Sequence, residues 1–244
     1  MSSPSAPADP KKAAGRAAAA LVESGMRIGL GTGSTTAFAI AEVGRRVREE
    51  GLRVAGVPTS FAAERLARQH GVPLLSTDDL GLDALDPEAP ALDLALDGAD
   101  EVDPAGALIK GRGAAHVREK VVAALAARFV VLVDESKLVD RLGTRMPVPV
   151  EVLPLAQPAV ARALRGLGAE PELRMGQQKD GPVVTDQGLW VLDARFDGID
   201  DAGGLGGAID GIPGVLGHGL FVGMATDVVV GAAGGGVRHL RPAA

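Results

Sequence analysis

Short apolar segments alternate with helix-like segments through the first half of this chain, and that alternation restricts the fold more than any other feature. Each apolar segment has the length and composition of a buried strand, and each intervening segment is long enough for a helix. The predicted strands are 27–30, 53–57, 91–96 and 129–133, and the predicted helices are 11–23, 36–50, 61–70 and 114–127. Strands separated by helices are joined by crossover connections, so this half predicts an α/β fold with a parallel sheet and helices on both faces.

The pattern changes after Pro147, where strands and helices no longer alternate regularly. A strand is predicted at 148–153, a helix at 159–167, short strands at 183–185 and 189–193, and a loop or weak helix at 203–207. This pattern is typical of a small α+β domain, and the apolar segment 227–231 is expected to return to the first sheet as its last strand. The predicted domains are therefore 11–146 with 220–244, and 147–219, while residues 1–10 are expected to form a disordered tail.

Composition excludes several classes of protein. The chain has 244 residues, of which 46% are hydrophobic but only 2% aromatic, so Ala, Val and Leu must build the core. It has no cysteine, which excludes disulfides, thiolate catalysis and cysteine-ligated metals. A net charge of −6 and the few aromatics disfavour nucleic acid as a partner. No segment is long enough to span a bilayer, so we expect a cytoplasmic protein without a membrane partner.

A glycine-rich loop, Gly31 to Thr35, follows the first predicted strand and opens a helix. Glycines let the backbone approach a ligand closely, and a helix N-terminus offers N–H groups to an anion. The loop lacks the Gly-Lys-Ser/Thr ending of a P-loop, and Thr36 stands where a dinucleotide fingerprint has its third Gly or Ala. A tight turn with a Ser/Thr helix cap is the structural alternative.

A second group holds four carboxylates in the seven residues from Asp97 to Asp103, directly after a predicted strand. Ligands of parallel sheets bind at the carboxyl ends of strands, and clustered carboxylates repel, so one can keep a proton and act as an acid. A solvated acidic turn and a divalent-metal site are the alternatives. No histidine accompanies the cluster, and Lys110 could neutralise it instead of a metal.

A third group combines Lys110, in a glycine-flanked loop, with Glu119. Glu119 is expected about two turns into the next helix, in a stripe of small and apolar residues, where partial desolvation would raise its pKa toward that of a general base. The alternative is a surface glutamate paired with Arg118 or Lys120. A fourth polar cluster, 134–137, follows the strand 129–133 and includes Lys137.

These motifs together resemble the type A ribose-5-phosphate isomerases in order and spacing. The segments that carry the resemblance are 29–35, 97–103, 108–113, 118–120 and 134–137, with further matches at 58–60, 149–152, 184–186 and 212–215. The resemblance covers nearly the whole chain after Lys11. It implies a Rossmann-like domain with a smaller α+β domain, in a homodimer or homotetramer, acting on a sugar phosphate in the non-oxidative pentose phosphate pathway.

The resemblance also implies roles for single residues. Near the substrate phosphate it places Lys11, Thr32, Gly33, Ser34 and Thr35. Around the reacting end it places Asp97, Gly98, Ala99, Asp100, Lys110, Gly111, Arg112 and Gly113. Glu119 matches the catalytic base and Lys137 a substrate-binding lysine. Arg112 departs from the family, which more often has glycine there, and a positive φ at that position would carry a steric cost.

The chemistry of an aldose–ketose isomerisation fits these residues. Glu119 would move the proton between the two carbons, Lys110 would stabilise the enediolate, and Asp97 would shuttle protons between oxygens, with Asp100 organising Lys110. No step needs a metal or a redox cofactor. Two rival hypotheses are a sugar-phosphate-sensing regulatory module and a nicotinamide-dependent oxidoreductase. Conversion of ribose 5-phosphate without added cofactor would separate the three.

Overall fold

The computed structural model describes residues 9–86 and 88–242, and the chain divides into two compact units. The first contains the described part of Met1–Gly98 with Leu125–Ser136 and Thr226–Pro242, and the second contains Ala99–Ala124 with Lys137–Ala225. The boundaries of these units differ from those of the domains expected above, and the expected domains stay a prediction. No helix within the described residues is long and apolar enough to cross a membrane.

The first unit is built on a six-stranded sheet in the order β13-β12-β6-β3-β1-β2. Its strands are β1 (Arg27–Leu30), β2 (Ala55–Pro58), β3 (Leu94–Gly98), β6 (Phe129–Asp134), β12 (Asp227–Gly231) and β13 (Val237–Leu240). All neighbours pair in parallel except β13, which pairs antiparallel with β12 at one edge. The predicted parallel sheet is confirmed, including the return of 227–231. The edge strand β13 was missed because three of its four residues are exposed and it lacks an apolar run.

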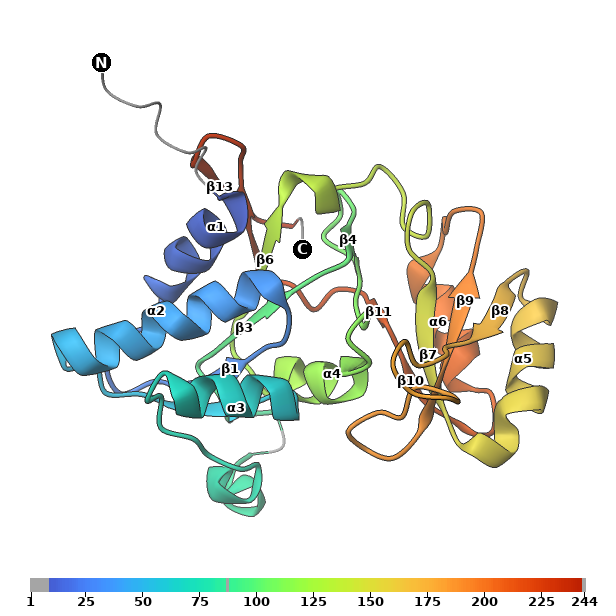
Figure 1. The fold of residues 1–244 in the computed structure, drawn as a ribbon, viewed down its shortest axis with the longest axis horizontal. Coiled ribbons are helices and arrows are strands. Elements are labelled where there is room, and N and C mark those ends of the chain that lie inside the picture. The colour runs from blue at the N-terminus through green and yellow to red at the C-terminus, as the bar shows by residue number, and fades with distance from the viewer. Residues whose placement is uncertain (1–8, 87, 243–244) are drawn as a thin grey trace. The chain divides into compact units, whose positions relative to one another are not determined.

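Three helices of this unit, α1 (Pro10–Ala19), α2 (Ser34–Glu50) and α3 (Phe61–Gln69), share one hydrophobic cluster with the sheet. Alternate strand residues supply the sheet side of the cluster: Ile28, Leu30, Leu94, Leu96, Val130 and Leu132. Alanines on the helices allow close packing, and a Cβ added at Gly15 of α1 would lie 2.7 Å from the Cβ of Phe38 in α2. Small side chains thus replace aromatic bulk in this core. The remaining predicted helix of the first half, 114–127, corresponds to α4 (His116–Ala124, labelled in Figure 1), which belongs to the second unit. Helices on both faces of this sheet therefore stay a prediction.

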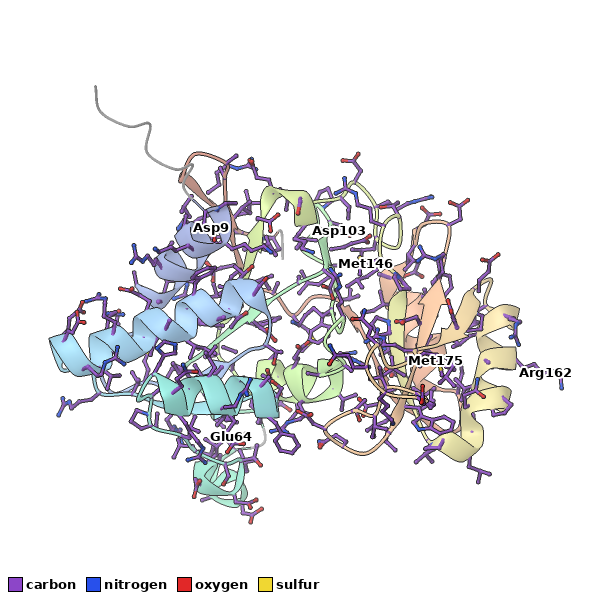
Figure 2. All side chains as sticks on the ribbon, in the orientation of Figure 1. Asp9, Glu64, Asp103, Met146, Arg162 and Met175 are labelled. Atoms are coloured by element: carbon purple, nitrogen blue, oxygen red, sulfur yellow. The ribbon has the colours of Figure 1, made fainter. Side chains whose placement is uncertain are left out.

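The start of α1 corrects the predicted tail. Asp9, labelled in Figure 2, caps the helix by accepting the Lys11 N–H at 2.9 Å, and Pro10 is its first residue. Proline suits this position because the missing N–H would have no partner within the helix. The tail expected at 1–10 was therefore wrong for its last two residues, and residues 1–8 lie outside the described part of the chain. The helix also ends at Ala19, four residues before the expected end.

The second unit contains two antiparallel sheets. One has the order β10-β7-β9-β8, and the other the order β11-β5-β4. The strands are β4 (Glu101–Val102), β5 (Leu108–Ile109), β7 (Val148–Val152), β8 (Glu170–Leu173), β9 (Trp190–Arg195), β10 (Val215–His218) and β11 (Leu220–Phe221). The helices are α4 (His116–Ala124), α5 (Gln157–Gly166) and α6 (Ala202–Asp210). Short 3₁₀ turns in the two units are η1 (Asp78–Leu80), η2 (Leu82–Ala84), η3 (Glu135–Lys137) and η4 (Pro154–Ala156).

The α+β character of this region is confirmed, but β8 and β10 have no counterpart among the predicted strands. The predicted strand 183–185 is only an isolated bridge between Val184 and Trp190, because Thr185 turns its hydroxyl into the following loop. The glycine-rich segment 203–207 is a helix, α6, whose start is capped by Asp201 accepting the Gly204 N–H at 2.8 Å. A Cβ at Gly206 would lie 3.1 Å from the His218 ring, so glycine here allows the helix to approach β10.

Glu101, a member of the predicted acidic cluster, is a structural clamp. Its side chain is 1% exposed, and its two carboxylate oxygens accept the N–H groups of Gly143, Arg145 and Met146, each at 2.7 Å. A carboxylate that accepts several backbone N–H groups compensates the loss of its hydration. Glu101, in β4, therefore anchors residues 143–146, the segment that precedes β7. It is not a candidate for proton transfer.

We expect Glu101→Gln to destabilise the protein by about 2–4 kcal/mol, because one oxygen becomes an NH₂ group that faces a backbone donor. Urea unfolding would measure this loss. Glu172→Gln, at an exposed position of the same unit, should change stability by no more than about 0.5 kcal/mol. Equal stability of the two variants would contradict the clamp.

Candidate active site

The glycine-rich loop joins β1 to α2 in the first unit. Gly33 precedes α2 with φ 111°, a conformation that L side chains rarely adopt, and the first residues of α2, Ser34 and Thr35, follow it. Lys11 reaches this loop from α1, and its Nζ donates to the Ser34 Oγ at 3.2 Å. The structure thus brings together an ammonium group, a hydroxyl and the N-terminus of a 17-residue helix, a combination that suits an anion.

Thr32 supports this loop through its side chain. The Thr32 Oγ1 lies 2.9 Å from the Thr59 Oγ1 and 2.7 Å from the Ser60 Oγ. Ser60 also accepts the Ala63 N–H at 3.0 Å and so caps α3. The hydroxyl of Thr32 therefore links the loop to the start of α3, which gives the matching segment 58–60 a structural role.

Asp97, the penultimate residue of β3, lies beside the same loop and is 2% exposed. Its Oδ1 accepts the N–H groups of Thr32 at 2.9 Å and Gly98 at 2.7 Å. A Cβ added at Gly31 would lie 2.2 Å from the Asp97 carboxylate, so only glycine lets the loop and the carboxylate meet at this distance. The two motifs that the sequence placed at strand ends are thus in direct contact.

Lys110 and Glu119 form a buried ion pair in the second unit. The Lys110 Nζ lies 3.2 Å from the Glu119 Oε2, and the side chains are only 3% and 5% exposed. Charges that have left water interact far more strongly than surface charges. The alternative of a surface glutamate paired with Arg118 or Lys120 is therefore wrong.

The position of Glu119 in its helix differs from the expectation. α4 begins at His116, so Glu119 lies in the first turn and not two turns in. The residues before His116 form a turn in which Ala114 donates its N–H to the Gly111 oxygen at 2.9 Å. Near a helix N-terminus the dipole favours a negative carboxylate. The ion pair and the helix start both act on the same group.

Arg112, which stands where the family more often has glycine, avoids the positive φ that would carry a steric cost there. In this loop the positive φ values belong to Gly111, at 105°, and Ala114, at 59°. The Arg112 N–H donates to the Asp100 carboxylate at 3.0 Å, and the carbonyls of Gly111 and Arg112 both accept from Arg174 at 3.0 Å. The loop thus depends on Arg174, which no sequence motif indicated, and the strain falls on Ala114.

His116 is buried directly behind this loop. It is 0% exposed, and among the described residues neither ring nitrogen has a hydrogen-bond partner. Burial, reinforced by the charges of Arg174 and Lys120, lowers the pKa of His116 to about 3. A Cβ at Gly111 would lie 2.8 Å from the His116 ring. His116 therefore fills the space under Gly111 as a neutral imidazole, at an energetic cost for its unmet polar groups.

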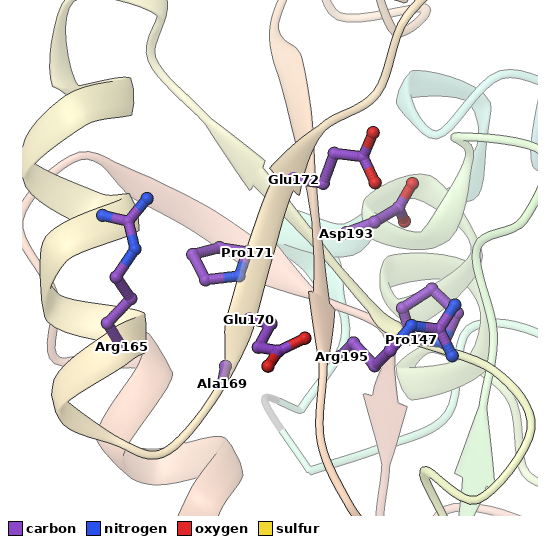
Figure 3. Close-up of a pocket in the computed structure, with 8 residues that line it drawn as sticks. All are labelled: Pro147, Arg165, Ala169, Glu170, Pro171, Glu172, Asp193 and Arg195. Atoms are coloured by element: carbon purple, nitrogen blue, oxygen red, sulfur yellow. The ribbon is translucent and has the colours of Figure 1, made fainter.

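The remaining predicted residues lie in the expected loops. Gly98 ends β3, Ala99 follows it, Gly113 is exposed beside Arg112, and the half-buried Lys137 closes the turn η3 after β6. Within the described ranges, no three His, Asp or Glu side chains gather in a way that could hold a metal ion. A cavity of about 330 Å³ beside β8 and β9 (Figure 3) is lined by none of the predicted site residues.

Comparison with known proteins decides the family. The family model described as ribose 5-phosphate isomerase A (phosphoriboisomerase A) matches residues 55–235. The chain belongs to this family. Ribose-5-phosphate isomerase A of Thermosynechococcus vestitus is 57% identical over 91% of this chain and 90% of that protein. The protein of the same name from Haloarcula marismortui is 51% identical over 92% of each.

Solved structures agree with this family. Ribose 5-phosphate isomerase A from Methanocaldococcus jannaschii has a TM-score of 0.88 at 46% identity, covering 96% of this chain and 98% of that one. A structure of D-ribose-5-phosphate isomerase in complex with phospho-erythronic acid has a TM-score of 0.89 at 46% identity, covering 95% and 97%. The predicted family and fold class are confirmed.

Gly31→Ala should lower isomerase activity by roughly 10- to 100-fold, because the new Cβ displaces the Asp97 carboxylate from the loop. Turnover and the melting temperature would be measured together. Gly207→Ala is the matched control, since a Cβ there meets nothing within 4 Å. Normal turnover in Gly31→Ala would show that the position of Asp97 is unimportant.

His116→Leu should make stability less sensitive to acid. The folded protein keeps His116 neutral down to about pH 3, whereas an ordinary imidazole binds a proton below about pH 6.5. The unfolded chain therefore binds more protons between these values, and stability falls as the pH falls. The free energy of unfolding, measured from pH 7 to pH 4, should depend less steeply on pH in His116→Leu than in the parent. His239→Leu, at an exposed position, should keep the pH dependence of the parent. Parallel curves for His116→Leu and the parent would contradict this assignment.

Proposed function

We propose that the chain interconverts D-ribose 5-phosphate and D-ribulose 5-phosphate through an enediolate. The observation that carries this proposal is the buried pair of Lys110 and Glu119, with 3.2 Å between Nζ and Oε2. A desolvated carboxylate beside an ammonium group supplies a base for carbon and a cation for the oxyanion that forms next to it. Membership of the isomerase family supports the same reaction.

The proposed chemistry assigns the carbon steps to Glu119. It removes the proton from C2 of the open-chain aldose, and the electrons of the C–H bond form the double bond of the enediolate. The negative charge that develops on oxygen is stabilised by the ammonium group of Lys110. Glu119 then returns its proton to C1, which completes the ketose.

The oxygen steps are assigned to Asp97. A proton moves from the hydroxyl at C2 to the oxygen at C1 during the isomerisation, and a held carboxylate can transfer it. The backbone N–H groups of Thr32 and Gly98 fix the Asp97 Oδ1 for this role. Asp100 is proposed to organise Lys110. The carboxylate of Asp100 accepts a hydrogen bond from the Arg112 N–H, which orients it.

Binding of the phosphate is assigned to Lys11 and the loop Thr32 to Thr35, with Lys137 as a further substrate-binding cation. The contact between Lys11 and Ser34 supports this assignment, since an ammonium group and a helix start both favour a dianion. A relative was solved in complex with phospho-erythronic acid, and a phosphorylated ligand in that relative supports a sugar phosphate as the substrate of this chain. The loops 97–100 and 110–113 are assigned to the reacting end.

We further propose a cytoplasmic homodimer or homotetramer that works in the non-oxidative pentose phosphate pathway. No metal or redox cofactor takes part in the proposed steps, since proton transfers and one oxyanion account for the whole reaction.

The proposed reaction is tested by adding ribose 5-phosphate to the purified chain in the presence of a strong chelator. Ribulose 5-phosphate should form, and Glu119→Gln should lower turnover by roughly 10²–10⁴-fold while a phosphorylated aldonate still binds. Failure of the parent chain to form ribulose 5-phosphate would overturn the reaction. Near-normal turnover of a folded Glu119→Gln variant would overturn only the assignment of the base.

A further inference from the structure

The ring of Phe221 faces two ammonium groups. The Lys110 Nζ lies 5.4 Å from the ring centroid, and the Lys120 Nζ lies 5.1 Å from it. Phe221 is fully buried. The face of an aromatic ring carries negative charge and attracts cations at this range, more strongly where water is excluded. The ring therefore attracts the ammonium group of Lys110 in addition to the Glu119 carboxylate.

Strand register explains why Phe221 reaches Lys110. In the antiparallel pair β5 and β11, Leu108 is opposite Phe221, and the Lys110 N–H continues the ladder by donating to the Gly219 oxygen at 2.8 Å. Side chains alternate along a strand, so Lys110 and Phe221 project from the same face as diagonal neighbours. Diagonal neighbours are within reach when one side chain is aromatic and the other is long.

Gly219 makes this close pairing possible. A Cβ added there would lie 2.1 Å from the Lys110 carbonyl oxygen. Any other residue would push β11 away from Lys110 and would move the Phe221 ring with it. The backbone thus holds the ring and the lysine in one register.

The surroundings of Lys120 differ from those of Lys110. Burial lowers the pKa of Lys120 to about 8, and the charge of Asp210 opposes this shift. Asp210 also lies 3.3 Å from the His218 Nε2, and burial lowers the pKa of His218. Lys120 is therefore mostly protonated near pH 7, and within the described part of the chain it forms no ion pair as close as that of Lys110 with Glu119.

We infer that Phe221 is a positioning residue, whose ring fixes the ammonium group of Lys110 where the enediolate forms. The inference rests on the proposed isomerisation. Glu119 changes its charge when it takes up the substrate proton, so its attraction for Lys110 weakens at the moment when the oxyanion needs the cation. The attraction of the ring does not change with that transfer, and it keeps Lys110 in place without touching the substrate.

The test replaces Phe221 by phenylalanines with one, two and three ring fluorines, which weaken the attraction for a cation stepwise and change the shape little. kcat for ribose 5-phosphate should fall with each fluorine, by roughly 3- to 30-fold in total, while KM and the melting temperature stay nearly constant. The pKa of Lys110, followed by NMR of ¹³C-labelled lysine, should fall along the same series, because the ring favours the charged form.

Two comparisons separate positioning from packing. The same fluorinated residues at Phe196, which packs against the hydrophobic cluster of the second unit, should leave kcat unchanged. In a Lys120→Met background, the decline of kcat along the Phe221 series should persist. A decline that vanishes there would assign the effect of the ring to Lys120 and overturn the inference.

The parent chain distinguishes the two proposals. If it forms ribulose 5-phosphate but kcat and the pKa of Lys110 are constant across the series, Phe221 is a packing residue only and the proposed reaction stands. If the parent forms no ribulose 5-phosphate, the reaction fails and the inference fails with it. A fluorinated variant that does not fold is replaced by Phe221→Leu, which should show the lower kcat at unchanged KM.

Discussion

The buried pair of Lys110 and Glu119 is the interaction on which the arrangement of the second unit depends. Two side chains that are 3% and 5% exposed hold opposite charges 3.2 Å apart. Removing either partner would leave an uncompensated charge away from water, which is among the most destabilising changes a protein can undergo. The neighbouring backbone must therefore deliver both groups accurately. β11 pairs with β5, which Lys110 follows directly, and the turn 111–115 precedes the helix that carries Glu119.

Glycine provides this accuracy at three points where backbone and side chains approach closely. A Cβ would lie 2.2 Å from the Asp97 carboxylate at Gly31, 2.8 Å from His116 at Gly111, and 2.1 Å from the Lys110 oxygen at Gly219. In each case the absence of a side chain lets the glycine backbone approach a candidate site residue or its immediate neighbour. These close contacts thus depend on glycines and not on the few aromatic residues of the chain. Phe221 differs from the other aromatic residues, because its ring lies 5.4 Å from the ammonium group of Lys110.

The fold was largely predictable from sequence because its main strands are continuous apolar runs. Every residue of β6 and of β12 is buried, and such runs separated by helices have few alternatives to a parallel sheet. The two-residue strands β4, β5 and β11 were not predictable, since a periodicity cannot be read from two residues. In addition, β11 lies more than a hundred positions after its partner β5. The same reason applies to Arg174, which binds the carbonyls of Gly111 and Arg112 across more than sixty positions.

Candidate residues were predictable by type, but their surroundings were not. Motif spacing selected Asp97, Lys110 and Glu119, yet it gave Glu101 the same weight as its neighbours. Only the structure shows that Glu101 is occupied by three backbone N–H groups. Likewise, Glu119 was placed two turns into its helix, because an alanine-rich sequence before His116 gives no sign of the turn that contains Ala114.

The two principal carboxylates are held by different means, and that difference suits different tasks. Two backbone N–H groups, of Thr32 and Gly98, fix one oxygen of Asp97 and restrict the movement of its carboxylate. Glu119 is held by the side chain of Lys110, whose ammonium group lies within reach of its carboxylate. In the proposed reaction a proton shuttle between oxygens needs a fixed relay, whereas the carbon base needs a cation beside it that can serve the oxyanion once the carboxylate has been neutralised. The ring of Phe221 would hold that ammonium group in one place, so that Lys110 serves the carboxylate first and the oxyanion afterwards without moving.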